Sequence, residues 1–198
     1  LEEMLKKQYG EEVFAKILAG YQARRPVTLR VNPIKADRNT VEQALTGAGI
    51  AFKYVSWYED AMVEDARKLD DFFSFDRILL DAPCSGSGTV EVRDGVCRTK
   101  ISKELVERSA RTQEELLKKA LKLLKSGHEM VYSTCSILKE ENEVLLKRVL
   151  KSAGGELVPI GEEWTKELPL LPNAMPGTLL VGPNELFEGF FVAKIRKK

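Results

Sequence analysis

The fold of this chain is decided by Leu79-Leu80-Asp81-Ala82-Pro83-Cys84-Ser85-Gly86-Ser87-Gly88 and by Val131-Tyr132-Ser133-Thr134-Cys135-Ser136. Each stretch is an apolar, strand-like run that ends in a small polar loop with one cysteine. In an open α/β sheet, ligands bind beyond the carboxyl ends of the strands. Two thiols and the Asp81 carboxylate at neighbouring strand ends indicate covalent catalysis by a thiolate.

Length and composition set the broad class. The chain has 198 residues, of which 43% are hydrophobic, as expected for one globular domain or one domain with a small appendage. Its net charge of +1 argues neither for nor against a nucleic-acid partner. No window approaches 18 apolar residues, so no membrane span is expected, and residues 1–7 lack the apolar core of a signal peptide. Three cysteines form no disulfide framework, which favours a reducing, cytoplasmic setting.

The pattern of apolar residues predicts two successive series of elements. The first is a small α+β module, with helices over 2–20 and 41–45 and strands over 27–31 and 51–57. The second alternates strands and helices, which predicts a mainly parallel sheet with helices on both faces. Its expected elements are strands 77–80 and 129–133, helices 104–125 and 140–150, and a closing antiparallel pair, 178–181 with 189–195.

One element of a nucleotide-type site is absent from the sequence. A doubly wound fold that binds such a cofactor normally opens with a strand, a glycine-rich turn and a helix. Between Ile50 and Cys84 there is no glycine. The strand over 51–57 runs almost directly into the strand over 77–80, which leaves room for about half of such a sheet.

The two cysteine segments resemble a known family. Residues 81–86 and 133–136 are similar to the two signature motifs of the RNA cytosine-5 methyltransferases of the Sun (Fmu) type. The resemblance extends over most of the chain, to Leu29-Arg30-Val31-Asn32-Pro33, to Gln113 with Leu116-Leu117, to Glu140-Glu141-Asn142-Glu143 and to Glu188-Gly189-Phe190-Phe191-Val192-Ala193-Lys194. It implies a Rossmann-like methyltransferase sheet, incomplete here, over residues 61–198, behind an N-terminal α+β RNA-binding module over residues 1–60.

The resemblance also implies roles for individual residues. Cys135 would be the nucleophile that adds to carbon 6 of cytosine and thereby activates carbon 5. Cys84 would assist the elimination that frees the product, and Asp81 would hold the ring nitrogen edge. The cofactor would be S-adenosylmethionine, bound through Asp65, Asp81 and Pro83.

The chain departs from this family at one place. The family's glycine-rich S-adenosylmethionine loop, and the acidic residue on its next strand, have no counterpart in the sequence. A second hypothesis is therefore a non-catalytic RNA-binding relative that has lost its cofactor site.

Simpler hypotheses for the cysteines compete with the catalytic one. Cys84 and Cys135 could be buried, inert thiols, since cysteine is among the most buried residue types. Cys97 reads as a spare packed cysteine. A zinc site built from Cys84, Cys97, His128 and Cys135 is conceivable, but no paired ligand spacing supports it, so no metal is expected. We expect His128 on a surface turn, and a monomer.

The expected partner is RNA, either rRNA or tRNA, and a basic segment could grip its backbone. Residues 24–38 contain five basic side chains, Arg24, Arg25, Arg30, Lys35 and Arg38, against one acidic side chain, Asp37. Asn32, in the segment similar to the family, would join the RNA-binding set. A solvated face without a ligand is the competing interpretation.

A triple variant in which Arg24, Arg25 and Arg30 are each changed to glutamine should bind RNA more weakly. It should also flatten the dependence of the binding constant on salt, because fewer counterions are released when fewer cations meet phosphates. Filter binding or fluorescence anisotropy across a salt series measures both effects. Unchanged affinity with an unchanged salt slope would identify the segment as a solvated face.

Overall fold

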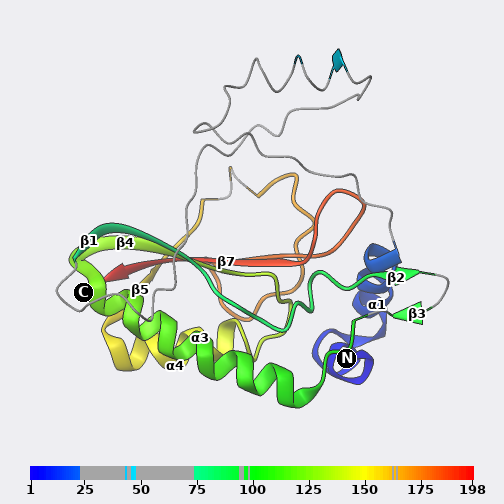
Figure 1. Cartoon of the computed structure of the whole chain (residues 1–198), viewed down its shortest axis with the longest axis horizontal. Helices are drawn as coiled ribbons and strands as arrows, with labels where there is room; N and C mark the ends of the chain where they lie inside the picture. The colour runs from blue at the N-terminus through cyan, green and yellow to red at the C-terminus, as the bar shows by residue number, and fades with distance from the viewer. Residues whose placement is uncertain are drawn as a thin grey trace. The chain divides into compact units, whose positions relative to one another are not determined.

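A computed structural model describes residues 1–22, 43, 46–47, 74–93, 96–97, 99–161, 163 and 165–198 of the chain (Figure 1). The chain divides into two compact units, one formed by residues 1–25 with 65–198 and the other by residues 26–64. The predicted strands over 27–31 and 51–57, most of the predicted helix over 41–45, Asp65 and the basic segment 24–38 lie outside the described residues.

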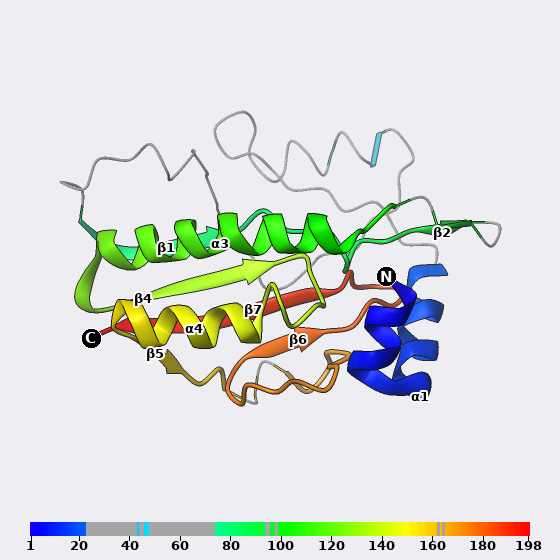
Figure 2. The same cartoon turned by 90° about the horizontal axis from the view of Figure 1, so that it is seen from below.

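A five-stranded sheet is the centre of the first unit. Its strands are β1 (Phe75–Asp81), β4 (Leu124–Thr134), β5 (Gly155–Val158), β6 (Leu179–Val181) and β7 (Phe190–Lys197). They are ordered β1-β4-β7-β5, with β6 also paired to β7 (Figures 1 and 2). Only β1 and β4 run parallel among these strands, because β7 is antiparallel to β4, β5 and β6. The expectation of a mainly parallel sheet is therefore wrong for the described residues, whereas the closing antiparallel pair is confirmed.

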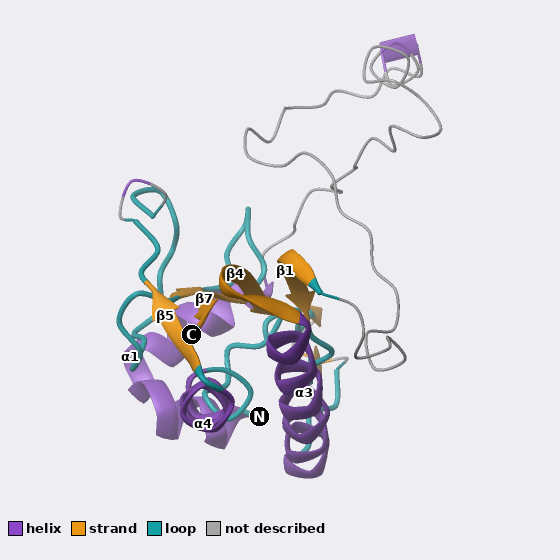
Figure 3. Ribbon diagram, turned by 90° about the vertical axis from the view of Figure 1, so that its left-hand side faces the viewer, coloured by secondary structure: helices purple, strands orange, loops and turns teal. Residues whose placement is uncertain are grey.

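Two helices, α3 (Lys103–Leu123) and α4 (Glu143–Ala153), lie on the same face of this sheet (Figure 3). Helices on both faces were expected, and the described residues do not place them so. The Ser102 side chain caps α3 by accepting a hydrogen bond of 3.2 Å from the Leu105 amide. Gly154, in the left-handed conformation, ends α4. The buried residues of each helix form an apolar stripe that faces the sheet.

The core lies between these helices and the sheet. Tyr132 of β4 and Phe191 of β7 are fully buried and meet edge to face, with ring centroids 6.3 Å apart. Leu117 and Leu121 of α3 are among the buried residues that cover them, and so is Leu146 of α4. The strand that leads to the second cysteine is thus anchored in the hydrophobic core.

The N-terminal helix α1 (Glu2–Gln22) belongs to the same unit as the sheet. It confirms the predicted helix over 2–20, but it is kinked at Gly10, whose φ of 76° is a conformation that favours glycine. Leu5, Ile17 and Tyr21 are buried in the common core. The helical part of the expected RNA-binding module therefore packs in one core with the strands that precede the two cysteines. The extent of that module, and its RNA binding, stay predictions.

Short strands were missed by the sequence reading. They are β5 and the hairpin of β2 (Val92–Arg93) with β3 (Val96–Cys97). Cys97 is exposed in this hairpin, so its assignment as a packed cysteine is wrong.

Within the described ranges, none of the helices has the length and apolarity needed to cross a membrane.

Packing of α4 against the sheet predicts a contrast between two neighbouring positions. Leu146 is fully buried, whereas Val144 is 48% exposed. Leu146→Ala should lower the free energy of unfolding by about 2–5 kcal/mol, because it leaves a cavity, and Val144→Ala should change it by less than about 0.5 kcal/mol. Urea unfolding followed by circular dichroism measures both, and equal effects would contradict this packing.

Candidate active site

The pairing of β1 with β4 brings the two cysteine loops together. The parallel register sets Asp81 opposite Ser133 at the carboxyl ends of both strands, and the Ala82 amide donates to the Ser133 carbonyl at 2.9 Å. Each chain then continues into its loop, and the Sγ atoms of Cys84 and Cys135 come within 3.0 Å of each other. The placement predicted from sequence, two thiols side by side at adjacent strand ends, is confirmed.

The contact between the sulfurs makes the two thiols unequal. A hydrogen bond from the Cys84 thiol stabilises the Cys135 thiolate, so it lowers the pKa of Cys135 and raises the pKa of Cys84. Burial adds to the rise at Cys84 and opposes the fall at Cys135. Both side chains are half-buried rather than enclosed. The contact therefore favours ionisation of Cys135 over ionisation of Cys84.

A fully buried carboxylate, Glu141, connects the residues that follow each cysteine. It accepts hydrogen bonds from the amide and hydroxyl of Ser85, at 2.7 and 2.6 Å, and from the hydroxyl of Ser136, at 2.6 Å. The Ser136 and Ser87 hydroxyls share a further hydrogen bond of 2.8 Å. Burial raises the pKa of Glu141, while these donors oppose the rise.

The segment that carries Glu141 is itself fixed to β4. The buried Tyr132 hydroxyl donates to the Glu141 carbonyl at 3.0 Å. The next residue, Asn142, accepts from the Thr134 hydroxyl at 2.7 Å and donates to the Ser136 carbonyl at 2.7 Å. Every side chain in this group is buried and bonded, which is the condition for a polar network to fix one geometry.

The loops also touch through their backbones at two glycines. The Gly88 amide donates to the Cys135 carbonyl at 2.9 Å, and the Gly189 amide donates to the Gly88 carbonyl at 2.8 Å. A Cβ at Gly88 would lie 2.0 Å from the Gly189 carbonyl oxygen, so only glycine allows this approach. The loop after β1 is thus bonded on one side to the second cysteine and on the other to the start of β7.

Helix α1 supports both loops from outside the sheet. The Gln8 side chain donates to the Ile137 carbonyl at 3.2 Å, and the Tyr9 hydroxyl donates to the same carbonyl. Near the end of the helix, the Tyr21 hydroxyl donates to the Ser87 carbonyl. The sequence alone predicted no role for four residues of this site: Gln8, Tyr9, Tyr21 and Glu141. Only Glu141 had a signal, because it lies in a segment similar to the family.

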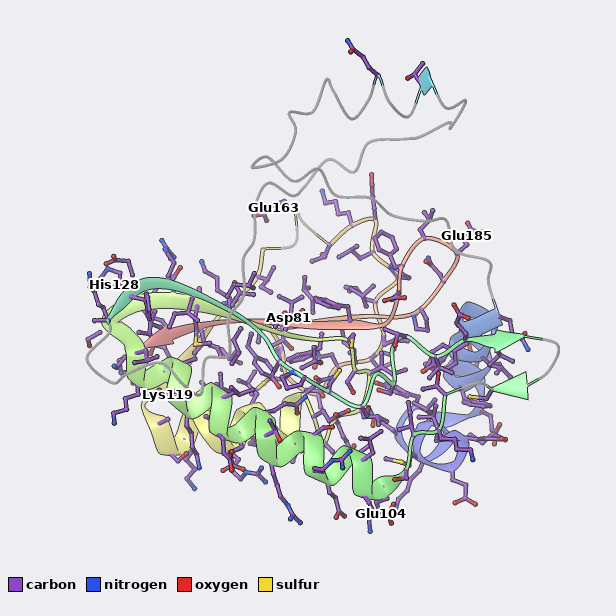
Figure 4. The ribbon with its side chains drawn as sticks, viewed as in Figure 1. Asp81, Glu104, Lys119, His128, Glu163 and Glu185 are labelled. Carbon is purple, nitrogen blue, oxygen red and sulfur yellow. The ribbon has the colours of Figure 1, made fainter. Side chains whose placement is uncertain are left out.

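Asp81 and Pro83 are exposed beside the sulfurs. One carboxylate oxygen of Asp81 accepts from the Ser133 hydroxyl at 2.9 Å, which orients the carboxyl group at the strand end (Figure 4). An exposed carboxylate next to a thiolate can receive a hydrogen bond from a ligand, as the Asp81 prediction requires. The roles of Asp81, Pro83 and both cysteines stay predictions, and Asp65 lies outside the described residues.

Of the four conceivable zinc ligands, only Cys84 and Cys135 meet. His128 lies within β4 (Figure 4), not on the expected surface turn, and contacts Asp76 at 3.3 Å. Cys135 follows the other end of that strand. Exposed Cys97 donates to the Thr99 carbonyl in the β2–β3 region. A separate surface hollow lies at the sheet edge where β1 and β4 begin and β7 ends. It is lined by Arg77, Gly127, His128, Glu129 and Arg196. In the described ranges, no cluster of three or more His, Cys, Asp or Glu side chains is arranged to hold a metal ion.

Comparison with known proteins agrees with this site. The family model for the 16S rRNA methyltransferase RsmB/F matches residues 31–196. The ribosomal RNA small subunit methyltransferase F of Aliivibrio salmonicida is 41% identical over 128 residues, covering 63% of this chain and 26% of the relative. The mouse 28S rRNA (cytosine-C(5))-methyltransferase is 35% identical over 179 residues, covering 84% of this chain and 22% of the relative. The chain thus spans about a quarter of the length of these relatives.

Solved structures show the same relationship. NSun6 from Pyrococcus horikoshii, determined with SFG, has a TM-score of 0.56 and 31% identity, covering 81% of this chain and 39% of that one. A methyltransferase homologue from the same organism has a TM-score of 0.50 and 35% identity, covering 64% of this chain and 40% of that one. These likenesses confirm the expected Rossmann-like methyltransferase fold, and by the match over residues 31–196 the chain belongs to the 16S rRNA methyltransferase RsmB/F family.

Proposed function

We propose that this chain carries the catalytic cysteines of an enzyme that methylates carbon 5 of cytosine in rRNA. The observation that carries the proposal is the 3.0 Å contact between a Cys135 sulfur of lowered pKa and a Cys84 thiol of raised pKa. Two relatives are named for rRNA substrates, which favours rRNA over tRNA. A base inside a helix would have to be unstacked to reach the sulfurs, so a loop or single-stranded target suits the site.

S-adenosylmethionine is the proposed methyl donor, and it would supply an electrophilic methyl group when bound. Asp81 and Pro83, exposed at the carboxyl end of β1, fit the ligand-facing edge where open α/β sheets bind cofactors. SFG, an analogue of this cofactor, is present in the NSun6 structure. In this chain Asp81 and Pro83 would form one side of the cofactor site.

Cys135 would begin the reaction. Its thiolate adds to carbon 6 of cytosine, a carbon–sulfur bond forms, and the electron pair moves to carbon 5, which becomes nucleophilic. The lowered pKa raises the fraction of thiolate at neutral pH, and the Cys84 thiol supplies the hydrogen bond that lowers it. Asp81 would accept a hydrogen bond from the ring nitrogen edge, which favours protonation of the ring as negative charge develops.

Cys84 would end the reaction, and the geometry gives a reason for the order. The largest cause of its raised pKa is the hydrogen bond to Cys135. When Cys135 becomes a thioether in the adduct, that sulfur is no longer an anion, so this largest cause is removed and Cys84 can give its proton to solvent water, against the remaining effect of burial. The Cys84 thiolate can then take the proton from carbon 5 as the carbon–sulfur bond breaks and the Cys135 thiolate leaves.

One observation favours the second candidate, a non-catalytic RNA-binding relative. The chain has no glycine between Ile50 and Cys84, where the cofactor loop of this family would lie. A relative that had lost its cofactor would still need a packed fold, but it would have no need of a thiolate. Reactivity of the cysteines therefore separates the two candidates.

Alkylation of the three cysteines across pH should rank them. Cys135 should react with iodoacetamide at lower pH than exposed Cys97, and Cys84 at higher pH. Cys84→Ala removes the hydrogen-bond donor, so the midpoint for Cys135 should rise toward the ordinary cysteine value of about 8.5. Peptide mass spectrometry measures each site, and Cys97→Ser serves as the control that leaves Cys135 unchanged. Identical midpoints at all three cysteines would favour the non-catalytic relative.

Substitution of each cysteine should block the methylation reaction at a different step. With RNA and S-adenosylmethionine, Cys135→Ala should abolish methyl transfer, because no adduct can form. Cys84→Ala should still form the adduct but release it slowly, so a covalent protein–RNA complex accumulates. A denaturing gel with labelled RNA detects the complex. A complex with Cys135→Ala and none with Cys84→Ala would reverse the two roles.

A further inference from the structure

We infer that Glu141 is a positioning residue that holds the two cysteine sulfurs in register. This inference deepens the proposed function and rests on it only for the role of the sulfurs. Three hydrogen bonds of 2.6–2.7 Å join one carboxylate to Ser85 and Ser136, the residues that directly follow Cys84 and Cys135. Among the described residues, no other buried acidic side chain bonds to both cysteine loops.

Glu141 acts through the residue that follows each cysteine. The Ser85 amide nitrogen is bonded directly to the Cys84 carbonyl carbon, so its 2.7 Å hydrogen bond fixes the peptide plane that leaves Cys84. On the other loop, the Ser136 hydroxyl accepts a hydrogen bond of 3.1 Å from the Leu138 amide and donates one to Glu141. The carboxylate thus holds the turn that leaves Cys135 as well as the turn that leaves Cys84.

The supporting residues place Glu141 before any ligand binds. Its own carbonyl accepts from Tyr132, and the adjacent Asn142 bonds to Thr134 and to the Ser136 carbonyl. The side chain is fully buried, so the loops meet a carboxylate that has few other positions to adopt. Its negative charge adds to the rise in the pKa of Cys84, after the sulfur hydrogen bond and burial.

Two substitutions separate hydrogen bonding from charge. Glu141→Gln can keep all three contacts: its carbonyl oxygen accepts from the Ser85 amide, and its NH₂ group donates to the two serine hydroxyls. Glu141→Ala removes the three contacts and leaves the buried donors unsatisfied. Glu140→Ala removes the same charge from the neighbouring exposed position and is the matched control.

The experiment measures how readily Cys84 and Cys135 form a disulfide with each other, which reports their effective concentration. It uses the full chain carrying Cys97→Ser, so that only these two thiols react. In glutathione buffers, the Cys84 and Cys135 thiols give two electrons and two protons to one oxidised glutathione, forming one protein disulfide and two reduced glutathiones. The equilibrium constant reports how well the fold holds the sulfurs together. We expect it to fall about tenfold in Glu141→Ala, by less than about threefold in Glu141→Gln, and not at all in Glu140→Ala.

An unchanged constant in folded Glu141→Ala, or an equal fall in Glu141→Gln and Glu141→Ala, would overturn the positioning role. If Glu141→Ala does not fold by circular dichroism, Ser85→Ala with Ser136→Ala removes the side-chain bonds from the other end. That double variant should lower the constant, and an unchanged value would again overturn the role. Neither RNA nor S-adenosylmethionine is needed, so a chain that transfers no methyl group yet shows the predicted order would contradict the proposed function alone.

Discussion

The parallel register of β1 with β4 is the constraint on which the rest of the site depends. It sets Asp81 opposite Ser133, so the two chains leave the sheet at the same level and their loops must share one space. A shift of one residue would turn the side chains of one strand to the other face. The buried Tyr132, on the strand that leads to Cys135, opposes such a shift because it packs edge to face against the buried Phe191 of β7.

Shared space alone does not bring two sulfurs to 3.0 Å, and the loops are fixed by further contacts of three kinds. Glu141 joins the side chains that follow the cysteines, Gly88 and Gly189 join the backbones, and α1 supports both loops through tyrosine hydroxyls. The result is a pair of cysteine sulfurs held in contact in the folded chain before substrate arrives. Such preorganisation is the condition under which hydrogen bonds alter reactivity without a cost at the moment of reaction.

Much of this arrangement could be predicted from sequence, because local patterns carried it. The apolar runs before Cys84 and Cys135 gave the strand ends, and helical periodicity gave α1 and α3. Short elements such as β5 and the β2–β3 hairpin lacked a periodic signal, since two to four residues cannot show one. The exposure of Cys97 and the kink at Gly10 depend on tertiary packing. The contacts of Glu141 with Ser85 and of Tyr21 with Ser87 join residues more than 50 positions apart, so no local sequence pattern marks them.

The central claim is that Cys135 forms a covalent bond with cytosine in RNA, and peptide mapping of a trapped complex tests it most directly. RNA carrying 5-azacytosine has nitrogen in place of carbon 5, so methyl transfer leaves no ring proton to remove and the adduct persists. After incubation with S-adenosylmethionine and digestion, mass spectrometry locates the nucleotide on a peptide. We predict that it is on Cys135. A nucleotide on Cys84 or Cys97, or unmodified peptides throughout, would contradict the claim.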